Sequence, residues 1–439
     1  MGHLQLVWPE KNQTRASSRS KMEETAAATA VSLPEDAIRE ILVRLEDTPA
    51  LFRCAVTCRQ WSRLVSDASF LRRCWPDDQS VCRRWSTFLA GFFTLKRLDR
   101  TDPTFVPGEV TFATFFVPTP LSVFGPCPRS LSSFFPETDP CLFDHAVPLA
   151  ARRGLLLVRI GVHGDFGYQY RLAMCNLLAG TCDVLPLLSG GLNFGKSGYA
   201  ILTSADCTTE QQPLLSSAGY STFFKVLILG MVYDGLDPNL YTFSSREARW
   251  SKPTKIAFGT YGQIGDCRHP DAVVSRGKVH WRVGSWSVDV DTETNHISRI
   301  MITRSYSQMY DEPQLTATAN GTLSVLLLSR PGLRLDIYTR QYQKKSYNGG
   351  TSKWLSAGTI TLKPPGRMER RPRPIFLSVL GEKSGTMLLK DSQKQIYMAD
   401  RETGVMEELT DCLDGLNRRK IILLEMDWSA LFISRLSRW

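Results

Sequence analysis

Two patterns of hydrophobic and polar positions divide the sequence. Between residues 32 and 75, apolar side chains recur every three or four positions, which is the period of α-helices with one buried face. Ser32-Leu33-Pro34 and Thr48-Pro49 offer helix starts, because Ser and Thr cap helices and Pro fits the first turn. From residue 76 onward, short β-forming runs alternate with Gly, Pro, Asn and Asp. The pattern predicts an all-α segment of three short helices followed by an all-β region.

The predicted helices carry more apolar positions than three short helices can bury. The segment has about 44 residues, and helical units of that size rarely form a sufficient core alone. Trp61 and the Leu33-Pro34 pair lie at the edges of the apolar stripes. One interpretation is a docking surface that a partner completes. The alternative is that these side chains pack on the C-terminal region of the same chain, and periodicity alone does not decide between the two.

The β-rich region repeats one unit: an apolar run, an alternating run, a polar turn and another strand-like run. The turns begin at Asn176, Ser244, Asp291, Thr339 and Asp400. Repeats of about 40–50 residues with several strands each are typical of propeller blades, and insertions explain the longer intervals. Residues 88–93 are predicted to supply strands of a first blade and residues 421–433 to close the ring. A β-sandwich or two smaller β domains is the alternative.

Composition defines the remaining regions and the setting. The chain has 439 residues and a net charge of +10. The whole surplus lies in residues 151–439, which hold 36 basic and 26 acidic side chains and would favour an acidic partner. Residues 1–31 are predicted to be a disordered leader, residues 32–75 a helical domain and residues 76–439 a β domain whose strands start near 86. Either Met1 or Met22 could be the start.

Neither a secretory signal nor an apolar run of about 20 residues is visible, so no membrane partner is expected. The 11 cysteines form no Cys-x-x-Cys pair and are expected to be free thiols in the cytoplasm, the nucleus or both. Basic residues are scattered, so no nucleic acid is expected either.

One motif requires a decision about catalysis. Gly190, Gly195, Lys196 and Ser197 fit the phosphate-loop pattern, in which a helix must follow the loop. The residues that follow here are β-formers, so nucleotide binding is kept only as a remote alternative. No other catalytic motif and no metal-ligand spacing stands out, and a non-catalytic protein without cofactors is expected.

The helical segment resembles the F-box. It has Leu33-Pro34 at the start, Ile41-Leu42 and Arg44-Leu45 in the first helix, and a Val56-x-Cys58-Arg59-x-Trp61 core. One departure is Glu46, where many members have Pro. The resemblance implies binding to the Skp adaptor of an SCF ubiquitin ligase and, through it, to a cullin scaffold. By matching positions, the interface would be formed or supported by Leu33, Pro34, Ile38, Ile41, Leu42, Leu45, Val56, Cys58, Trp61 and Leu64, although some of these must form the internal core.

The whole chain is similar to F-box proteins common in grasses and other plants, in which a propeller-like associated domain follows the F-box. The sequence features that carry this resemblance are Ala90-Gly91-Phe92-Phe93, Gly198-Tyr199-Ala200, FKVLILG, REARWSKP and GKVHW. The resemblance implies a substrate-recognition subunit of an SCF-type ligase, acting in the ubiquitin conjugation pathway, whose β domain binds a protein substrate. An F-box scaffold acting outside a ubiquitin ligase is the alternative.

Overall fold

A computed structural model describes residues 33–45, 48–75, 86–97, 112–164, 167–188, 192–207, 223–230, 238–256, 267, 271–302, 311–329, 333–341, 353–366, 376–409 and 416–436. The expected leader over residues 1–31 lies outside these residues. The chain separates into two compact units, Met1–Glu46 and Asp47–Trp439. The expected boundary between a helical domain and a β domain, at residue 75, is a separate question and stays a prediction.

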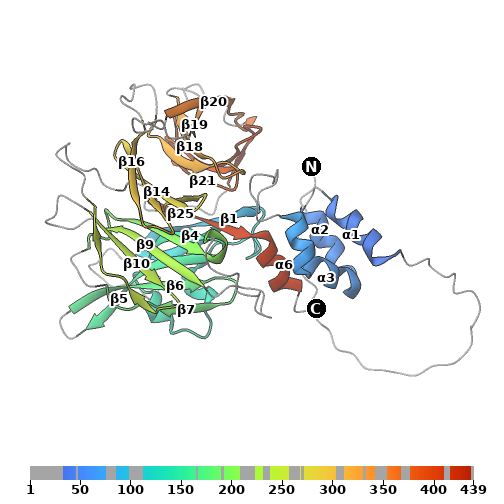
Figure 1. Cartoon of the computed structure of the whole chain (residues 1–439), viewed down its shortest axis with the longest axis horizontal. Helices are drawn as coiled ribbons and strands as arrows, with labels where there is room; N and C mark the ends of the chain where they lie inside the picture. Colours follow the sequence, from blue (N-terminus) through green and yellow to red (C-terminus); the bar gives the residue numbers. More distant parts are fainter. Residues whose placement is uncertain are drawn as a thin grey trace, which may run out of the picture. The chain divides into compact units, whose positions relative to one another are not determined.

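The first unit contributes helix α1 (Glu35–Val43) (Figure 1). Pro34 precedes the helix, where its missing N–H costs no hydrogen bond, and Glu35 and Asp36 place negative charge in the first turn. Ile38 and Leu42 are buried, whereas Ile41 is exposed. The helix therefore has one buried stripe and one apolar side chain outside it.

Three further short helices follow in the second unit: α2 (Thr48–Ala55), α3 (Arg59–Ser66) and α4 (Ala68–Cys74). With α1, the described part of residues 33–75 thus forms four short helices, one more than the three that were expected. The reason is Asp67, whose extended backbone ends α3 and whose carboxylate accepts hydrogen bonds from Ser69 N (2.9 Å) and Phe70 N (3.2 Å). Asp67 is therefore the N-cap of a separate helix.

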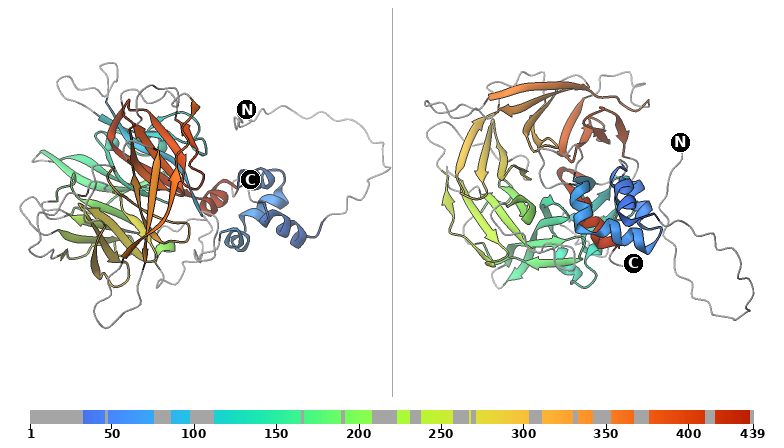
Figure 2. Two further views of the ribbon diagram at one scale, coloured as in Figure 1. Left: turned by 90° about the horizontal axis from the view of Figure 1, so that it is seen from above. Right: turned by 45° about the vertical axis from the view of Figure 1, so that its right-hand side comes forward.

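The β region is a six-bladed propeller, and Figure 2 shows its sheets arranged around a common axis. The β-sandwich and two-domain alternatives are wrong. From the inner strand outward, blades 1 to 3 are β25 (Leu416–Asp427), β1 (Thr87–Arg97), β2 (Phe112–Pro118) and β3 (Arg129–Ser130); β4 (Val147–Arg152), β5 (Leu155–Gly164), β6 (Gly167–Asn176) and β7 (Thr181–Val184); and β8 (Gly198–Thr203), β9 (Phe224–Gly230), β10 (Asn239–Ser244) and β11 (Arg249–Trp250), with β12 (Thr254–Lys255) also on β10.

Blades 4 to 6 repeat the arrangement. They are β13 (Val273–Ser275), β14 (Lys278–Val283), β15 (Trp286–Asp291) and β16 (Ile297–Met301); β17 (Gln314–Ala317), β18 (Leu323–Leu328), β19 (Arg334–Gln341) and β20 (Lys353–Thr361); and β21 (Leu377–Lys383), β22 (Thr386–Asp391), β23 (Ile396–Asp400) and β24 (Met406–Glu408). The inner strands of successive blades neighbour one another around the axis.

Both ends of the β region meet in blade 1. The C-terminal strand β25 is innermost there and pairs antiparallel with the N-terminal strand β1, with Phe93 opposite Ile422. This pairing confirms that residues 88–93 belong to a first blade and that residues from 421 close the ring. The closing strand ends at Asp427, and helix α6 (Trp428–Leu436) follows it.

The predicted turns follow the third strand of blades 2 to 6. Asn176, Asp291 and Asp400 each end such a strand, and the side-chain oxygen of each accepts hydrogen bonds from backbone N–H groups two and three residues further on. Ser244 ends β10. The prediction at Thr339 is early, because β19 continues to Gln341. The recurring Asx turn explains why the sequence showed the repeat.

Each pair of adjacent blades shares a hydrophobic cluster, because the apolar faces of the twisted sheets cover each other. The cluster between blades 1 and 2 includes Phe93, Val158, Cys175 and Leu424. The corresponding clusters continue around the ring to blades 6 and 1. The propeller therefore covers its own apolar surface without a partner.

Candidate functional site

The ten residues proposed for adaptor binding fall into different environments. Ile38, Leu42 and Leu64 are buried, at 6%, 1% and 0% exposure, and they act as core. Leu45 and Trp61 are half-buried. The remaining five are exposed: Leu33, Pro34, Ile41, Val56 and Cys58. The structure thus separates core from surface, a division that the sequence left open.

The exposed apolar side chains are the notable part of this set. Leu33 is 52%, Ile41 53% and Val56 36% exposed. Val56 lies in the turn before α3, next to Cys58, whose Sγ accepts a hydrogen bond from Trp61 N at 3.5 Å. Apolar groups gathered within such a short helical stretch indicate a surface for another protein.

Helix α6 connects the second-unit helices to the propeller. Trp428 stacks on Phe88 of β1, with ring centroids 3.9 Å apart. One turn further, Phe432 contacts Phe52 of α2 at 5.5 Å and Trp75 at 5.7 Å. The alternative in which apolar residues of the helical segment pack on the chain's own C-terminal region therefore holds for Phe52 and Trp75, while Val56 stays exposed.

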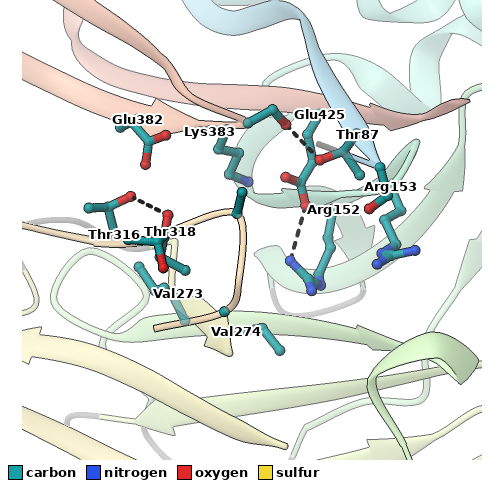
Figure 3. Close-up of a pocket in the computed structure, with 16 residues that line it drawn as sticks. Thr87, Arg152, Arg153, Val273, Val274, Thr316, Thr318, Glu382, Lys383 and Glu425 are labelled. Atoms are coloured by element: carbon teal, nitrogen blue, oxygen red, sulfur yellow. Dashed lines mark hydrogen bonds and ion pairs between the residues drawn. The ribbon is translucent and has the colours of Figure 1, made fainter. Parts of the chain in front are cut away.

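The propeller contains a cavity of about 100 Å³ at the ends of its inner strands (Figure 3). Its lining includes Arg152 of β4, Glu382 and Lys383 of β21, and Glu425 of β25. Ser86 and Thr87 also line it, and the Ser86 carbonyl accepts a hydrogen bond from Trp428 N at 3.0 Å. The cavity is therefore at the end of the propeller where strand β1 and helix α6 begin.

An ion network crosses the channel at this level. Arg152 donates to Asp206 Oδ2 (3.0 Å) in blade 3 and to Glu425 Oε1 (3.0 Å) in blade 1. Lys383 Nζ of blade 6 donates to Asp271 Oδ2 (2.6 Å) before blade 4, and to the Ala151 carbonyl in blade 2. These side chains join five of the six inner strands or the residues flanking them.

Burial and pairing set the pKa values in this network in opposite directions. Arg152 holds the pKa of Asp206 below its usual value, although burial opposes this. Burial raises the pKa of Asp271 despite Lys383. Burial also raises the pKa of Glu382 to about 7, because Arg401 is 3.9 Å away and Gly385 N is its hydrogen-bond donor. Glu382 is thus the carboxyl of the cavity that changes charge near neutral pH.

Sequence reasoning missed this network, since its members are far apart along the chain. A weak signal existed, because Arg152, Lys383 and Glu425 each lie within the last three residues of an otherwise apolar inner strand. The cations of the cavity are paired with carboxylates. The network can therefore lock the blades together and hold a small polar ligand or water, but it does not present the surplus positive charge of the chain.

The phosphate-loop match does not form a phosphate loop. Gly195, Lys196 and Ser197 lead directly into strand β8 instead of a helix. The Ser197 hydroxyl donates to the Asn193 carbonyl at 2.7 Å and is buried. Gly190 lies outside the described residues. Without a helix N-terminus the site lacks the dipole and N–H groups that hold a phosphate.

A buried Ser-His-Asp constellation connects blades 4 and 5. His280 Nδ1 lies 2.7 Å from Asp289 Oδ1, which also accepts a hydrogen bond from Ser287, and Arg340 of β19 donates to the other carboxylate oxygen. The four side chains are buried, so substrate cannot reach them. The group acts as a structural connection between blades. His163 has no described side-chain environment.

Two surveys of the described residues complete the site. Among them, no cluster of three or more His, Cys, Asp and Glu side chains could hold a metal ion. In the same part of the chain, every helix is too short or too polar to cross a membrane.

Residues 30–75 match the family described as F-box-like. No curated protein matches the chain at a significant level. Together with the fold, the match establishes an F-box-like domain followed by a six-bladed β-propeller, a combination that fits a substrate-recognition adaptor.

Several solved structures are distantly similar. A prolyl endopeptidase is 14% identical over 60% of this chain and 36% of its own, with a TM-score of 0.31. A functionally unknown protein from Desulfotomaculum acetoxidans DSM 771 is 10% identical over 72% of this chain and 83% of its own (TM-score 0.33). The Cps50 (Swd1) β-propeller domain of Myceliophteria thermophila is 12% identical over 74% and 87% (TM-score 0.34). This chain spans about a third of the prolyl endopeptidase, and similarity at these levels supports no functional argument.

Proposed function

We propose that this chain is the substrate-recognition subunit of an SCF-type ubiquitin ligase. The observation that carries the proposal is the F-box-like segment with apolar side chains left exposed, since F-box domains generally bind Skp-type adaptors. Leu33, Ile41 and Val56 are the proposed contacts, with Pro34, Cys58 and Trp61 beside them in the sequence. Ile38, Leu42 and Leu64 support this surface from within.

The propeller is the proposed substrate-binding part. Its blades cover their own apolar faces, which leaves the loops and strand edges around the ring for recognition. The receptor would perform no covalent chemistry and would act by holding a target lysine at high effective concentration near a bound ubiquitin-conjugating enzyme. The positive charge of residues 151–439 favours an acidic substrate, with cytoplasm or nucleus as the compartment. Similarity to the grass-type family is part of the same proposal.

The proposal is tested by capture of a purified Skp-type adaptor on the full chain. The test variant is Leu33→Ala with Ile41→Ala. The matched control is Leu187→Ala with Leu355→Ala, two propeller positions of 56% and 44% exposure. We expect the test variant to lose at least tenfold in affinity, about 1.4 kcal/mol or more, and the control to bind like wild type. Failure of wild type to bind, or equal binding by the test variant, contradicts the proposal.

The scaffold alternative is separated by a second measurement. A ligase subunit must bring a cullin with the adaptor, so a cullin should co-purify with wild type and with the control, but not with the test variant. Proteins bound by the propeller should also accumulate in cells that express the test variant, because their ubiquitylation stops. Adaptor binding without a cullin and without such accumulation would favour the scaffold.

A further inference from the structure

Two cysteines face each other across the outer strands of blade 2. Cys175 of β6 and Cys182 of β7 are register partners, and their sulfur atoms are 3.3 Å apart. Both are free thiols. Cys175 is buried in the cluster between blades 1 and 2, and Cys182 packs against that cluster while remaining partly accessible. The pair thus has one protected and one accessible sulfur.

The ladder geometry suits a covalent bond between them. Leu185 N donates to the Leu172 carbonyl at 2.8 Å, which makes Leu172 and Leu185 a hydrogen-bonded pair. Hydrogen-bonded and non-hydrogen-bonded pairs alternate in an antiparallel ladder, so the cysteines, three positions on, form a non-hydrogen-bonded pair with Cα atoms about 4.5 Å apart. A disulfide tolerates Cα separations of about 4.4–6.8 Å. Side-chain rotation can therefore close the remaining gap without moving the strands.

The two thiols differ in reactivity. The hydrogen bond from Cys175 lowers the pKa of the Cys182 thiol, although partial burial opposes this. Burial raises the pKa of Cys175 well above its usual value. Because the thiolate is the nucleophile, Cys182 reacts first and Cys175 resolves the product.

We propose that Cys175 and Cys182 are a reversible modification site that hydrogen peroxide converts into a disulfide. The Cys182 thiolate attacks one peroxide oxygen, the O–O bond breaks, and Cys182 becomes a sulfenic acid while the leaving hydroxide takes a proton to become water. Cys175 sulfur then attacks Cys182 sulfur, the S–O bond breaks, and the departing hydroxide accepts the Cys175 proton. Two thiols and one peroxide give one disulfide and two waters, and a thiol reductant reverses the change.

The disulfide would fasten strand β7 to β6 beside the blade in which the chain ends meet. The constraint acts mainly on the unfolded chain and encloses a short loop. In a domain of this size we expect the midpoint of thermal unfolding to rise by about 1–3 °C. Stability gained at this position would slow opening of the ring next to its closure.

The experiment uses the reduced full chain, titrated with hydrogen peroxide, alkylated and digested with trypsin. Arg171 and Lys196 place both cysteines in one peptide, residues 172–196. We expect this peptide to lose two hydrogen atoms in mass and to escape alkylation, and dithiothreitol to restore both thiols. The exposed Cys127 and Cys141 serve as internal controls and should remain alkylatable at the same peroxide dose. Oxidation of the controls while the pair keeps both thiols would overturn the proposal.

Two single variants test the order of events. In Cys175→Ser, Cys182 should stop at the sulfenic acid and be trapped by dimedone. In Cys182→Ser, Cys175 should stay reduced, because it is buried and lacks the activated partner. Serine is close to cysteine in size, and a thermal melt checks that both variants fold. Equal dimedone labelling of the two variants, or irreversible oxidation of the wild-type pair in place of a disulfide, would contradict the assignment.

Discussion

The N-terminal helices and the propeller bury their apolar side chains in opposite ways. In the propeller, each blade covers the apolar face of its neighbour, and the ring closes when β25 joins β1. Along α1 and in the turn before α3, Ile41 and Val56 remain exposed. A repeat that closes on itself leaves no apolar face over, whereas a short helical segment cannot cover all of its own. The surplus on the helices therefore indicates a partner, and single exposed residues on the propeller do not.

Charge shows the reverse contrast. Among the described residues of the helical segment, every charged side chain is exposed or half-exposed. The propeller instead buries Arg152, Asp206 and Glu425 in its channel. A buried ion pair contributes to one specific arrangement more than to net stability, but breaking it strands a charge. The two regions should therefore respond to opposite kinds of substitution.

The largest expected effect is that of Arg152→Ala. It leaves Asp206 and Glu425 buried without their common partner, and we expect a loss of about 3–5 kcal/mol in the free energy of unfolding. Urea denaturation of the full chain measures it. The control is Arg249→Ala, whose pair with Glu247 is exposed and should change stability by less than about 0.5 kcal/mol. Equal losses in the two variants would remove the contrast between buried and surface charge.

Phe432→Ala tests how far the helices depend on the propeller. Phe432 is fully buried and contacts Phe52 and Trp75, so its truncation should cost about 3 kcal/mol. The loss should fall on α2 to α4. Hydrogen exchange should accelerate in residues 48–75 while the inner strands of the propeller keep their protection. If exchange accelerates equally in both regions, the helices and blades form one cooperative unit instead.

Glu382→Gln separates burial from charge within the channel. With its pKa raised to about 7, native Glu382 binds more protons than the unfolded chain between about pH 4.5 and 7, so wild-type stability falls as pH rises through this range. Gln keeps the acceptor for Gly385 N and avoids the charge. The variant should exceed wild type by about 1–3 kcal/mol at pH 8 and match it near pH 4.5. Denaturation curves at the two pH values decide, and a pH-independent difference would contradict the assigned cause.

The propeller could be predicted because its signals are local. Asn176, Asp291 and Asp400 mark the same turn in successive blades, and each turn needs only its own neighbouring residues. The channel network could not, because Arg152 meets Glu425 only after the ring has closed. The same reason applies to Cys175 and Cys182 in part: they are close in sequence, but their pairing depends on a register that the sequence pattern does not fix.

In the helical segment, periodicity identified the apolar positions but not their environments. Ile41 and Leu42 are neighbours of similar type, yet one is exposed and the other buried. Sequence spacing places both near the stripe, and only the helix geometry separates them. The fourth helix was missed because Asp67 and Ser69 read as a continuation of the third.

The smallest expected change in stability has the most specific consequence. Ile41 of α1 is 53% exposed and Leu355 of β20 is 44% exposed. Truncation of either to Ala should change the free energy of unfolding by less than about 0.5 kcal/mol, since neither leaves a cavity. Adaptor capture should nevertheless fall only for Ile41→Ala, because Leu355 lies on a propeller edge. Parallel denaturation and binding curves for the two variants measure this. If both keep full adaptor affinity, exposure on the helices has no more meaning than exposure on the blades.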